Sequence, residues 1–236
     1  MQEIIKINFI DKARNGKSLN SYDIETIREL CFQLNWRNID EYWLQQDVSE
    51  FYSFLMDLFK AEMIKLQKNI ITEGIPSNDD IAKELLPFIQ LHVPNDKNSI
   101  TVKEMLDTWM YENYLSLKRE VVTIRGKEEK LINGIGSYKL LNNPNIIALN
   151  INRFDGIGGK RNECDIIIQK KISISKDQLL ENNDWYFHAA ICHKGETPKQ
   201  GHYYTLLNKN NNYYIFDDQL VPCLNQVSIK EEKIIS

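Results

Sequence analysis

Two short β patterns near the C-terminal end, residues 202–207 and 213–216, are separated by a polar stretch of Asn and Lys, and this arrangement predicts a β-hairpin. Such a hairpin would return Asp217 beside His202, fifteen positions earlier (217 minus 202). A carboxylate bonded to Nδ1 would fix the imidazole tautomer and raise its basicity. The pair therefore matches the base and the orienting acid of a nucleophilic triad. A histidine and a strand-end aspartate with purely structural roles fit the spacing equally well.

The first third of the chain is predicted to be helical. Asn20 and Ser21 can cap one helix, and a second helix is predicted to begin near Asp47. A wide apolar stripe from Phe51 to Leu66 favours a long core helix there. Residues 72–80 contain Gly, Pro, Ser and Asn, so they are predicted to form a loop.

After residue 88 the patterns favour strands. Apolar residues alternate over 89–93, and a short helix is predicted around Met105. Further strands are predicted at residues 121–124, 146–151, 166–174, 185–193, 202–207 and 213–216. Helices followed by mostly antiparallel strands predict an α+β fold, with residues 1–236 forming one domain that has a helical part (1–87) and a β-rich part (88–236).

Composition and motifs argue against several kinds of partner and site. The formal net charge of -4 argues against nucleic acid, because phosphate binding needs a basic excess. The apolar runs are too short to span a membrane and no signal peptide opens the chain, so we expect no membrane partner and an intracellular location, in the cytoplasm or nucleus. Four widely separated cysteines indicate a reducing compartment and argue against a structural zinc site. The glycine-rich residues 156–160 match no phosphate-loop spacing, and no cofactor is expected.

Two acidic residues, Asp47 and Glu50, lie on one side of the first turn of the second predicted helix. They would compensate the helix dipole, which stabilises a helix by roughly some tenths of a kcal/mol. Alternatively, the two carboxylates form an acidic patch that binds a basic peptide. Physical chemistry alone favours the first interpretation.

Motifs in a particular order resemble those of the ubiquitin-specific protease family, a papain-like class of cysteine deubiquitinases. Residues 45–51 are similar to its Gln-Gln-Asp-Ala-x-Glu-Phe helix, and residues 143–154 to its Pro-x-x-Leu-x-x-x-Leu-Lys-Arg-Phe strand. Residues 189–203 resemble its histidine box, and residues 213–218 its closing Trp-Tyr-x-Phe-Asp-Asp segment. The resemblance extends from residue 44 to residue 221 and implies the family's fold, with a helical thumb-like part and an antiparallel β palm-and-fingers-like part.

The resemblance also implies roles for individual residues. His202 would be the general base, Asp217 its orienting partner, and Asp218 would lie close to the oxyanion. The partner would be ubiquitin or a ubiquitin-like protein. The residues implied to bind its basic C-terminal tail are Asp47, Glu50, Phe154, His193 and Gly201.

The chain departs from the family at the nucleophile. The family's Gly-x-x-Asn-x-Gly-Asn-Thr-Cys-Tyr-x-Asn segment has no counterpart, and Cys31, the only cysteine before the helix motif, lies in an amphipathic helical pattern. The Cys-x-x-Cys pairs of the family's zinc-bearing fingers are also missing. One interpretation is a deubiquitinase whose nucleophile lies on sequence outside residues 1–236. The other is a catalytically inactive pseudoenzyme that binds ubiquitin or scaffolds an assembly. The intact His202–Asp217 pair favours the first.

Overall fold

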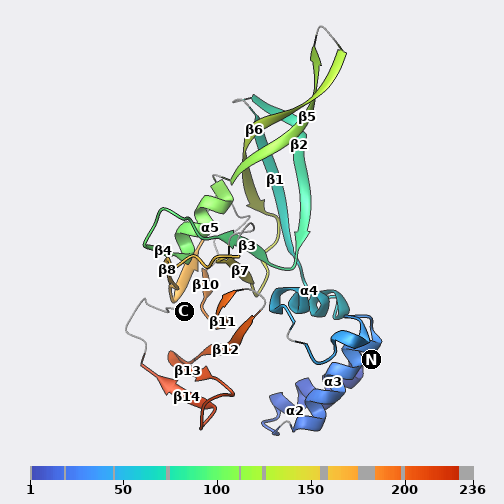
Figure 1. Cartoon of the computed structure of the whole chain (residues 1–236), viewed down its shortest axis with the longest axis vertical. Coiled ribbons are helices and arrows are strands. Elements are labelled where there is room, and N and C mark those ends of the chain that lie inside the picture. Colours follow the sequence, from blue (N-terminus) through green and yellow to red (C-terminus); the bar gives the residue numbers. More distant parts are fainter. Residues whose placement is uncertain are drawn as a thin grey trace. The chain divides into compact units, whose positions relative to one another are not determined.

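The chain divides into two compact units in the computed structural model, Met1–Glu62 and Met63–Ser236. The residues that the structure describes are 2–18, 20–44, 46–72, 75–111, 113–123, 126–154, 159–174, 184–197 and 200–228. The first unit is helical and the second is built mainly of strands (Figure 1). Sequence patterns placed the end of the helical part at residue 87, whereas the units divide at residue 62, because residues 64–86 form strands.

The helices of the first unit are α1 (Gln2–Ile5), the π-helix η1 (Lys6–Ile10), α2 (Asp11–Arg14), α3 (Ser21–Gln33), the 3-10 helix η2 (Ile39–Glu41) and α4 (Val48–Leu58). The predicted cap of α3 is confirmed. The Asn20 side chain accepts a hydrogen bond from the Asp23 N–H at 2.9 Å, and the Asp23 carboxylate accepts one from the Asn20 N–H at 3.1 Å. Asp23 also pairs with Lys12 at 2.6 Å, which ties α2 to the start of α3.

Helix α4 ends at Leu58, so the prediction of a helix that continues to Leu66 is wrong. Lys60 adopts a positive φ of 50°, and its N–H donates to the Asp57 carbonyl, while the next N–H, of Ala61, donates to the Met56 carbonyl. These two bonds form a Schellman closure, which satisfies the last carbonyls of a helix and turns the chain away. The apolar residues beyond this closure belong to a strand.

A four-stranded antiparallel sheet follows in the order β2-β1-β6-β5. Its strands are β1 (Ile64–Thr72), β2 (Ile75–Leu86), β5 (Asn113–Thr123) and β6 (Gly126–Leu140). The predicted loop at residues 72–80 is therefore wrong from Ile75 onward, and its residues 73 and 74 lie outside the described part of the chain. In Figure 1 the β5–β6 hairpin extends well beyond the rest of the sheet as a long arm.

Shorter strands complete the middle of the second unit: β3 (Ile89–His92), β4 (Ser99–Thr101), β7 (Leu149–Asn152), β8 (Asp165–Ile167), β9 (Lys171–Ser173) and β10 (Asp184–Tyr186). Strands β3 and β7 pair in parallel, as do β4 and β8, so the mostly antiparallel prediction holds with two exceptions. The single strand predicted over residues 166–174 is two strands, and the one predicted over 185–193 is also divided.

Helix α5 (Val102–Tyr111) lies at the centre of the core, as predicted around Met105. Met105, Leu106 and Met110 are buried against the strands, and Trp109 stacks on Tyr138 of β6 with ring centroids 4.0 Å apart. Burying three such side chains contributes about 1.5–3 kcal/mol each relative to exposing them. None of the described helices is long and apolar enough to cross a bilayer.

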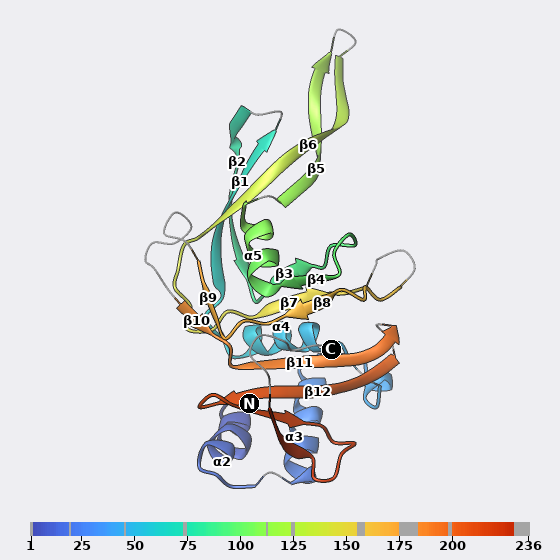
Figure 2. The ribbon, with the colours of Figure 1, turned by 90° about the vertical axis from the view of Figure 1, so that its left-hand side faces the viewer.

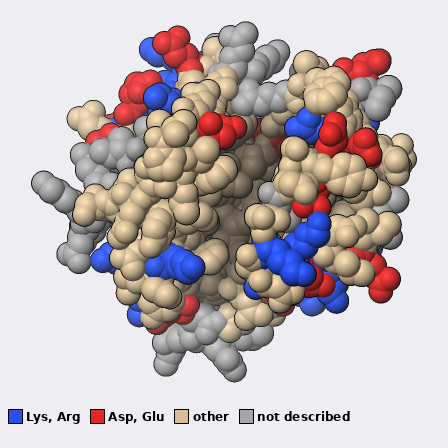
Figure 3. All heavy atoms as spheres, turned by 90° about the horizontal axis from the view of Figure 1, so that it is seen from below, with Lys and Arg blue, Asp and Glu red and all other residues tan. Residues whose placement is uncertain are grey.

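The C-terminal sheet has the order β11 (Ala189–Thr197), β12 (Gln200–Lys209), β13 (Asn212–Phe216) and β14 (Leu224–Val227), all antiparallel. Figure 2 shows β11 and β12 running side by side. Asn210 and Asn211 both have positive φ (54° and 62°), which a two-residue type I′ turn requires. The hairpin predicted from the sequence is therefore confirmed. On the face shown in Figure 3, basic and acidic side chains are interspersed.

Candidate active site

The imidazole of His202 and the carboxylate of Asp217 are in direct contact. His202 Nε2 lies 2.7 Å from Asp217 Oδ1, and the side chains are 20% and 18% exposed. Thr205 pairs with Phe216, and continuing this register places Asp217 opposite Tyr204, with His202 two positions along on the same face. Diagonal neighbours on one face of a sheet are within reach of long side chains, so the hairpin geometry produces the contact.

Backbone groups fix the orientation of Asp217. The Gln219 N–H donates to Oδ1 at 3.0 Å, and the Asp217 N–H donates to the Cys223 carbonyl at 2.8 Å. The hydrogen bond from Gln219 and the one from His202 lower the pKa of Asp217, because both stabilise the ionised carboxylate. An ionised carboxylate can only accept, so the proton of the shared hydrogen bond is on His202 Nε2.

This geometry corrects the expectation that the carboxylate would bind Nδ1. Asp217 contacts Nε2, and the neutral imidazole then carries its lone pair on Nδ1. Nδ1 is therefore the nitrogen that can accept a proton from a nucleophile, while Asp217 stabilises the imidazolium that results.

Asp218 lies beside the same imidazole nitrogen but does not bind it. Its Oδ1 is 3.7 Å from His202 Nε2, and its side chain is 75% exposed. The distance exceeds that of a hydrogen bond, so Asp218 acts on His202 only through space. The expected position of Asp218 near an oxyanion stays a prediction.

A second cluster contains three residues implied to bind a ubiquitin tail, Gly201, His193 and Phe154. The ring of His193 lies 4.8 Å from that of Tyr203, its cross-strand partner, and 6.2 Å from that of Phe154, edge-on. Gly201 permits this arrangement, because a Cβ there would stand 2.2 Å from His193 Nε2 and 2.7 Å from the Lys194 carbonyl. The structure brings these residues together; their role toward a tail stays a prediction.

Arg153 is a residue whose importance the sequence patterns missed, although it directly precedes Phe154. Its guanidinium donates to the Asn162 carbonyl at 2.9 Å and to the Cys164 carbonyl at 2.8 Å. Desolvation lowers the pKa of Arg153, a cost that these hydrogen bonds partly offset. The guanidinium therefore holds the segment after residue 159 against the end of β7, where Phe154 begins.

In the first unit, Asp47 and Glu50 both have structural partners. Asp47 caps α4 by accepting from the Ser49 and Glu50 N–H groups at 2.8 and 2.9 Å. Glu50 forms an ion pair with Arg37, whose guanidinium lies 5.0 Å from the ring centroid of Trp36. These contacts explain both acids without a ligand, and their proposed contact with a basic tail stays a prediction.

The cysteines give no sign of an activated thiol. Burial raises the pKa of Cys31, Cys164 and Cys192, and Cys192 also shares a hydrogen bond with Tyr204. A raised pKa leaves less thiolate, which is the nucleophilic form. Cys31 is only 2% exposed in α3, consistent with the structural role expected for it.

We expect Cys223, the exposed thiol, to react with iodoacetamide at least about tenfold faster than Cys31 or Cys164, because alkylation needs an accessible thiolate. Peptide mapping by mass spectrometry over a labelling time course would measure the rates. All four cysteines should react at similar rates in denaturant. Rapid labelling of Cys31 in the folded chain would contradict its placement in the core.

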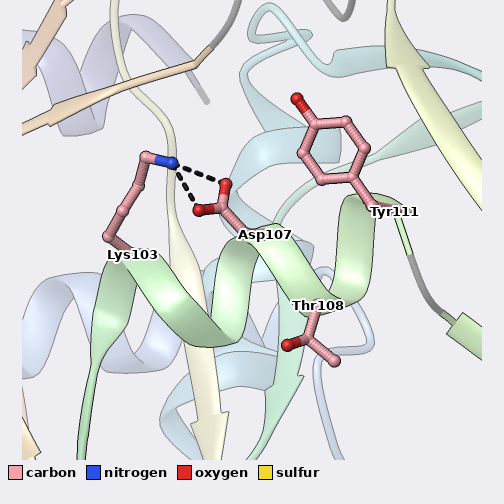
Figure 4. Close-up of a pocket in the computed structure, with 4 residues that line it drawn as sticks. All are labelled: Lys103, Asp107, Thr108 and Tyr111. Carbon is pink, nitrogen blue, oxygen red and sulfur yellow. Dashed lines mark hydrogen bonds and ion pairs between the residues drawn. The ribbon is translucent and has the colours of Figure 1, made fainter.

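A pocket of about 350 Å³ lies on α5, away from the histidine cluster in sequence and element (Figure 4). Its lining residues are Lys103, Asp107, Thr108 and Tyr111. Lys103 Nζ binds both carboxylate oxygens of Asp107, at 2.6 and 2.5 Å, so the charges of this pocket neutralise each other. It offers no reactive group comparable with His202.

Comparison with known families identifies the chain. The family model described as ubiquitin carboxyl-terminal hydrolase matches residues 16–233, a span that contains the His202–Asp217 pair. The chain belongs to the ubiquitin carboxyl-terminal hydrolase family. The resemblance drawn from the motifs is thereby confirmed.

Individual members of the family are distant from this chain. Ubiquitin carboxyl-terminal hydrolase 46 of Caenorhabditis elegans is 26% identical over 95 residues, which cover 37% of this chain and 22% of that protein. A chain of the SAGA Ubp8/Sgf11/Sus1/Sgf73 DUB module bound to ubiquitin aldehyde has a TM-score of 0.66 and 14% identity, over 93% of this chain. The same module bound to monoubiquitin gives 0.67 and 15%, over 91%.

The solved relatives show that this family member has the papain-like ubiquitin-specific protease fold, with mixed helices and sheets as predicted. The chain spans about half the length of the solved chains that it matches, 55% and 52%. The activity of a whole protein therefore cannot be transferred to residues 1–236 without further argument.

Proposed function

We propose that this family member acts in a cysteine-type deubiquitinase that removes ubiquitin or a ubiquitin-like protein from conjugates, with a nucleophilic thiol on sequence outside residues 1–236. The observation that carries the proposal is the 2.7 Å contact between His202 Nε2 and an ionised Asp217, which leaves Nδ1 to act as a base. The absence of an activated thiol among the four cysteines, all of which are described, supports an external nucleophile.

In the proposed reaction, His202 Nδ1 takes the proton of the thiol, and the sulfur attacks the carbonyl of the terminal glycine of ubiquitin. The C–N bond to the conjugated amine breaks, and the imidazolium gives its proton to the leaving amine. Water then attacks the thioester while His202 accepts its proton, which releases the glycine carboxylate and returns the thiol. Asp217 holds the ring and stabilises its charged form throughout.

Ubiquitin is proposed as the partner because the solved relatives are modules bound to ubiquitin aldehyde and to monoubiquitin. We propose no nucleic-acid or membrane partner, in keeping with the net charge of -4. Four free cysteines favour a reducing compartment, the cytoplasm or nucleus. The second candidate, a pseudoenzyme that binds ubiquitin without cleaving it, is favoured by the same absence of an activated thiol.

Binding of ubiquitin to the whole chain, measured by isothermal titration calorimetry, tests the proposed partner. Asp47→Asn keeps a good helix cap but removes the charge, because Asn and Asp cap helices about equally well. We expect it to weaken binding about tenfold, equivalent to about 1.4 kcal/mol, if the carboxylate meets the basic tail. Asp57→Asn is the matched control on the same helix, where Asp57 is exposed and pairs with Lys60.

The outcomes separate the interpretations. Binding that is weakened by Asp47→Asn and unchanged by Asp57→Asn supports the proposed partner and the acidic contact. Binding that neither substitution affects would restrict Asp47 to its structural role as the cap of α4. No binding of ubiquitin or of a ubiquitin-like protein would contradict the proposed function.

A further inference from the structure

Three possible metal ligands converge at the end of the β12–β13 hairpin: His202 Nε2, a carboxylate oxygen of Asp217 and one of Asp218. All three atoms lie within 4.8 Å of one another. We propose that this cluster binds a divalent transition-metal cation, and that Zn²⁺ is the ion it fits best. The proposal concerns a binding property of the chain and does not depend on the proposed deubiquitinase activity.

The spacing of the ligand atoms fits a tetrahedral ion. Zn²⁺ binds nitrogen and oxygen at about 2.0–2.2 Å, so adjacent ligand atoms lie about 3.3 Å apart in a tetrahedral shell. His202 Nε2 is 2.7 Å from Asp217 Oδ1 and 3.7 Å from Asp218 Oδ1, values on either side of that separation. Small side-chain rotations are therefore enough, and the exposed Asp218 side chain is able to make them.

The chemistry of the ligands favours a transition metal over calcium or magnesium. Imidazole suits zinc and its neighbours, whereas Ca²⁺ and Mg²⁺ prefer shells made only of oxygen. Two carboxylates also neutralise the charge of a divalent ion. Lys194, the cross-strand partner of His202, acts on Asp217 through space and opposes the cation. A site of modest affinity is the expected result.

The surroundings supply the support that metal ligands usually have. The Gln219 N–H donates to Asp217 Oδ1, and the Asp217 N–H is held by the Cys223 carbonyl, so the carboxylate is oriented before a metal arrives. His202 remains 20% exposed and Asp218 75% exposed, which leaves an entry path and room for water in the fourth position.

Metal binding and the His202–Asp217 hydrogen bond exclude each other. Coordination by Nε2 requires its lone pair, so the proton must move from Nε2 to Nδ1. The nitrogen that would act as a base then carries a proton. A bound cation is therefore an inhibitor of any reaction that uses His202 as its base.

Titration calorimetry of ZnCl₂ into the whole chain, without ubiquitin, tests the proposal. We expect one ion per chain, loss of binding in His202→Ala, and at least about a tenfold loss of affinity in Asp218→Asn. Asp107→Asn is the matched control, because it removes an exposed carboxylate on α5 and should leave the affinity unchanged. Circular dichroism would establish that each variant is folded.

The exposed thiol of Cys223 is the competing explanation, and Cys223→Ser distinguishes it. Retained affinity in Cys223→Ser together with the loss in Asp218→Asn supports the cluster. Binding that is lost in Cys223→Ser but kept in Asp218→Asn, or no binding at all, would overturn the proposal. Because the assay contains no ubiquitin, its failure leaves the proposed deubiquitinase function unaffected.

Discussion

The 236-residue chain on its own is expected to release the fluorophore from a ubiquitin–fluorophore conjugate about a million-fold more slowly than a complete thiol hydrolase. Removing the nucleophile from a catalytic triad costs on the order of a million-fold in turnover, because base and acid then have nothing to activate. A continuous fluorescence assay at micromolar chain measures the rate. A thiol-directed ubiquitin probe, followed by mass spectrometry, should label no cysteine.

A longer natural polypeptide that contains residues 1–236 and a further cysteine is the informative comparison. If the proposed function is right, it should cleave the substrate, and His202→Ala should abolish that cleavage while leaving ubiquitin binding in place. Robust probe labelling of Cys31 in the present chain would refute the external nucleophile. Ubiquitin binding without turnover in every natural form would identify a pseudoenzyme.

Gly201→Ala is expected to destabilise the second unit by about 1–3 kcal/mol, the cost typical of an overpacked core, and to reduce ubiquitin affinity at least about tenfold. The new Cβ would lie 2.2 Å from His193 Nε2 and 2.7 Å from the Lys194 carbonyl, so the His193 ring or the β11–β12 backbone must move. Urea unfolding followed by circular dichroism gives the free energy, and calorimetry gives the affinity.

A double-mutant cycle identifies the contact responsible. His193→Ala removes the imidazole that the new methyl group meets, so Gly201→Ala should cost less in the His193→Ala background than in the parent chain. Gly134→Ala serves as a graded control, because its Cβ would meet its nearest atom, the Ile71 carbonyl oxygen, only at 3.2 Å. Equal costs of Gly201→Ala in both backgrounds would show that the His193 ring is not the obstacle.

Local sequence predicted features that depend on short stretches of chain. The cap at Asn20 and the β12–β13 hairpin both arise from interactions within a few residues, and the hairpin turn uses two asparagines that tolerate positive φ. The long helix through Leu66 failed for the same kind of reason in reverse. Its apolar stripe read as continuous, but the positive φ of Lys60 ends the helix and starts a strand.

The candidate site divides in a similar way. Sequence placed His202 and Asp217 together, but the nitrogen that meets the carboxylate depends on the turn at Gln219 and on the Cys223 carbonyl. The role of Arg153 depends on two carbonyls that its own segment of chain does not predict. Likewise, the pairing of Glu50 with Arg37 joins residues whose charges looked independent in the sequence.

The amino-acid sequence by itself determined the family, the order of helices and strands in outline, and the identity of the histidine–aspartate pair. Each of these follows from residue types at fixed spacings along one stretch of chain. Only the tertiary structure decided the imidazole tautomer, the space that Gly201 leaves for His193, and the clamp formed by Arg153. These depend on ångström-scale distances between separate segments, which packing sets and which no local pattern encodes.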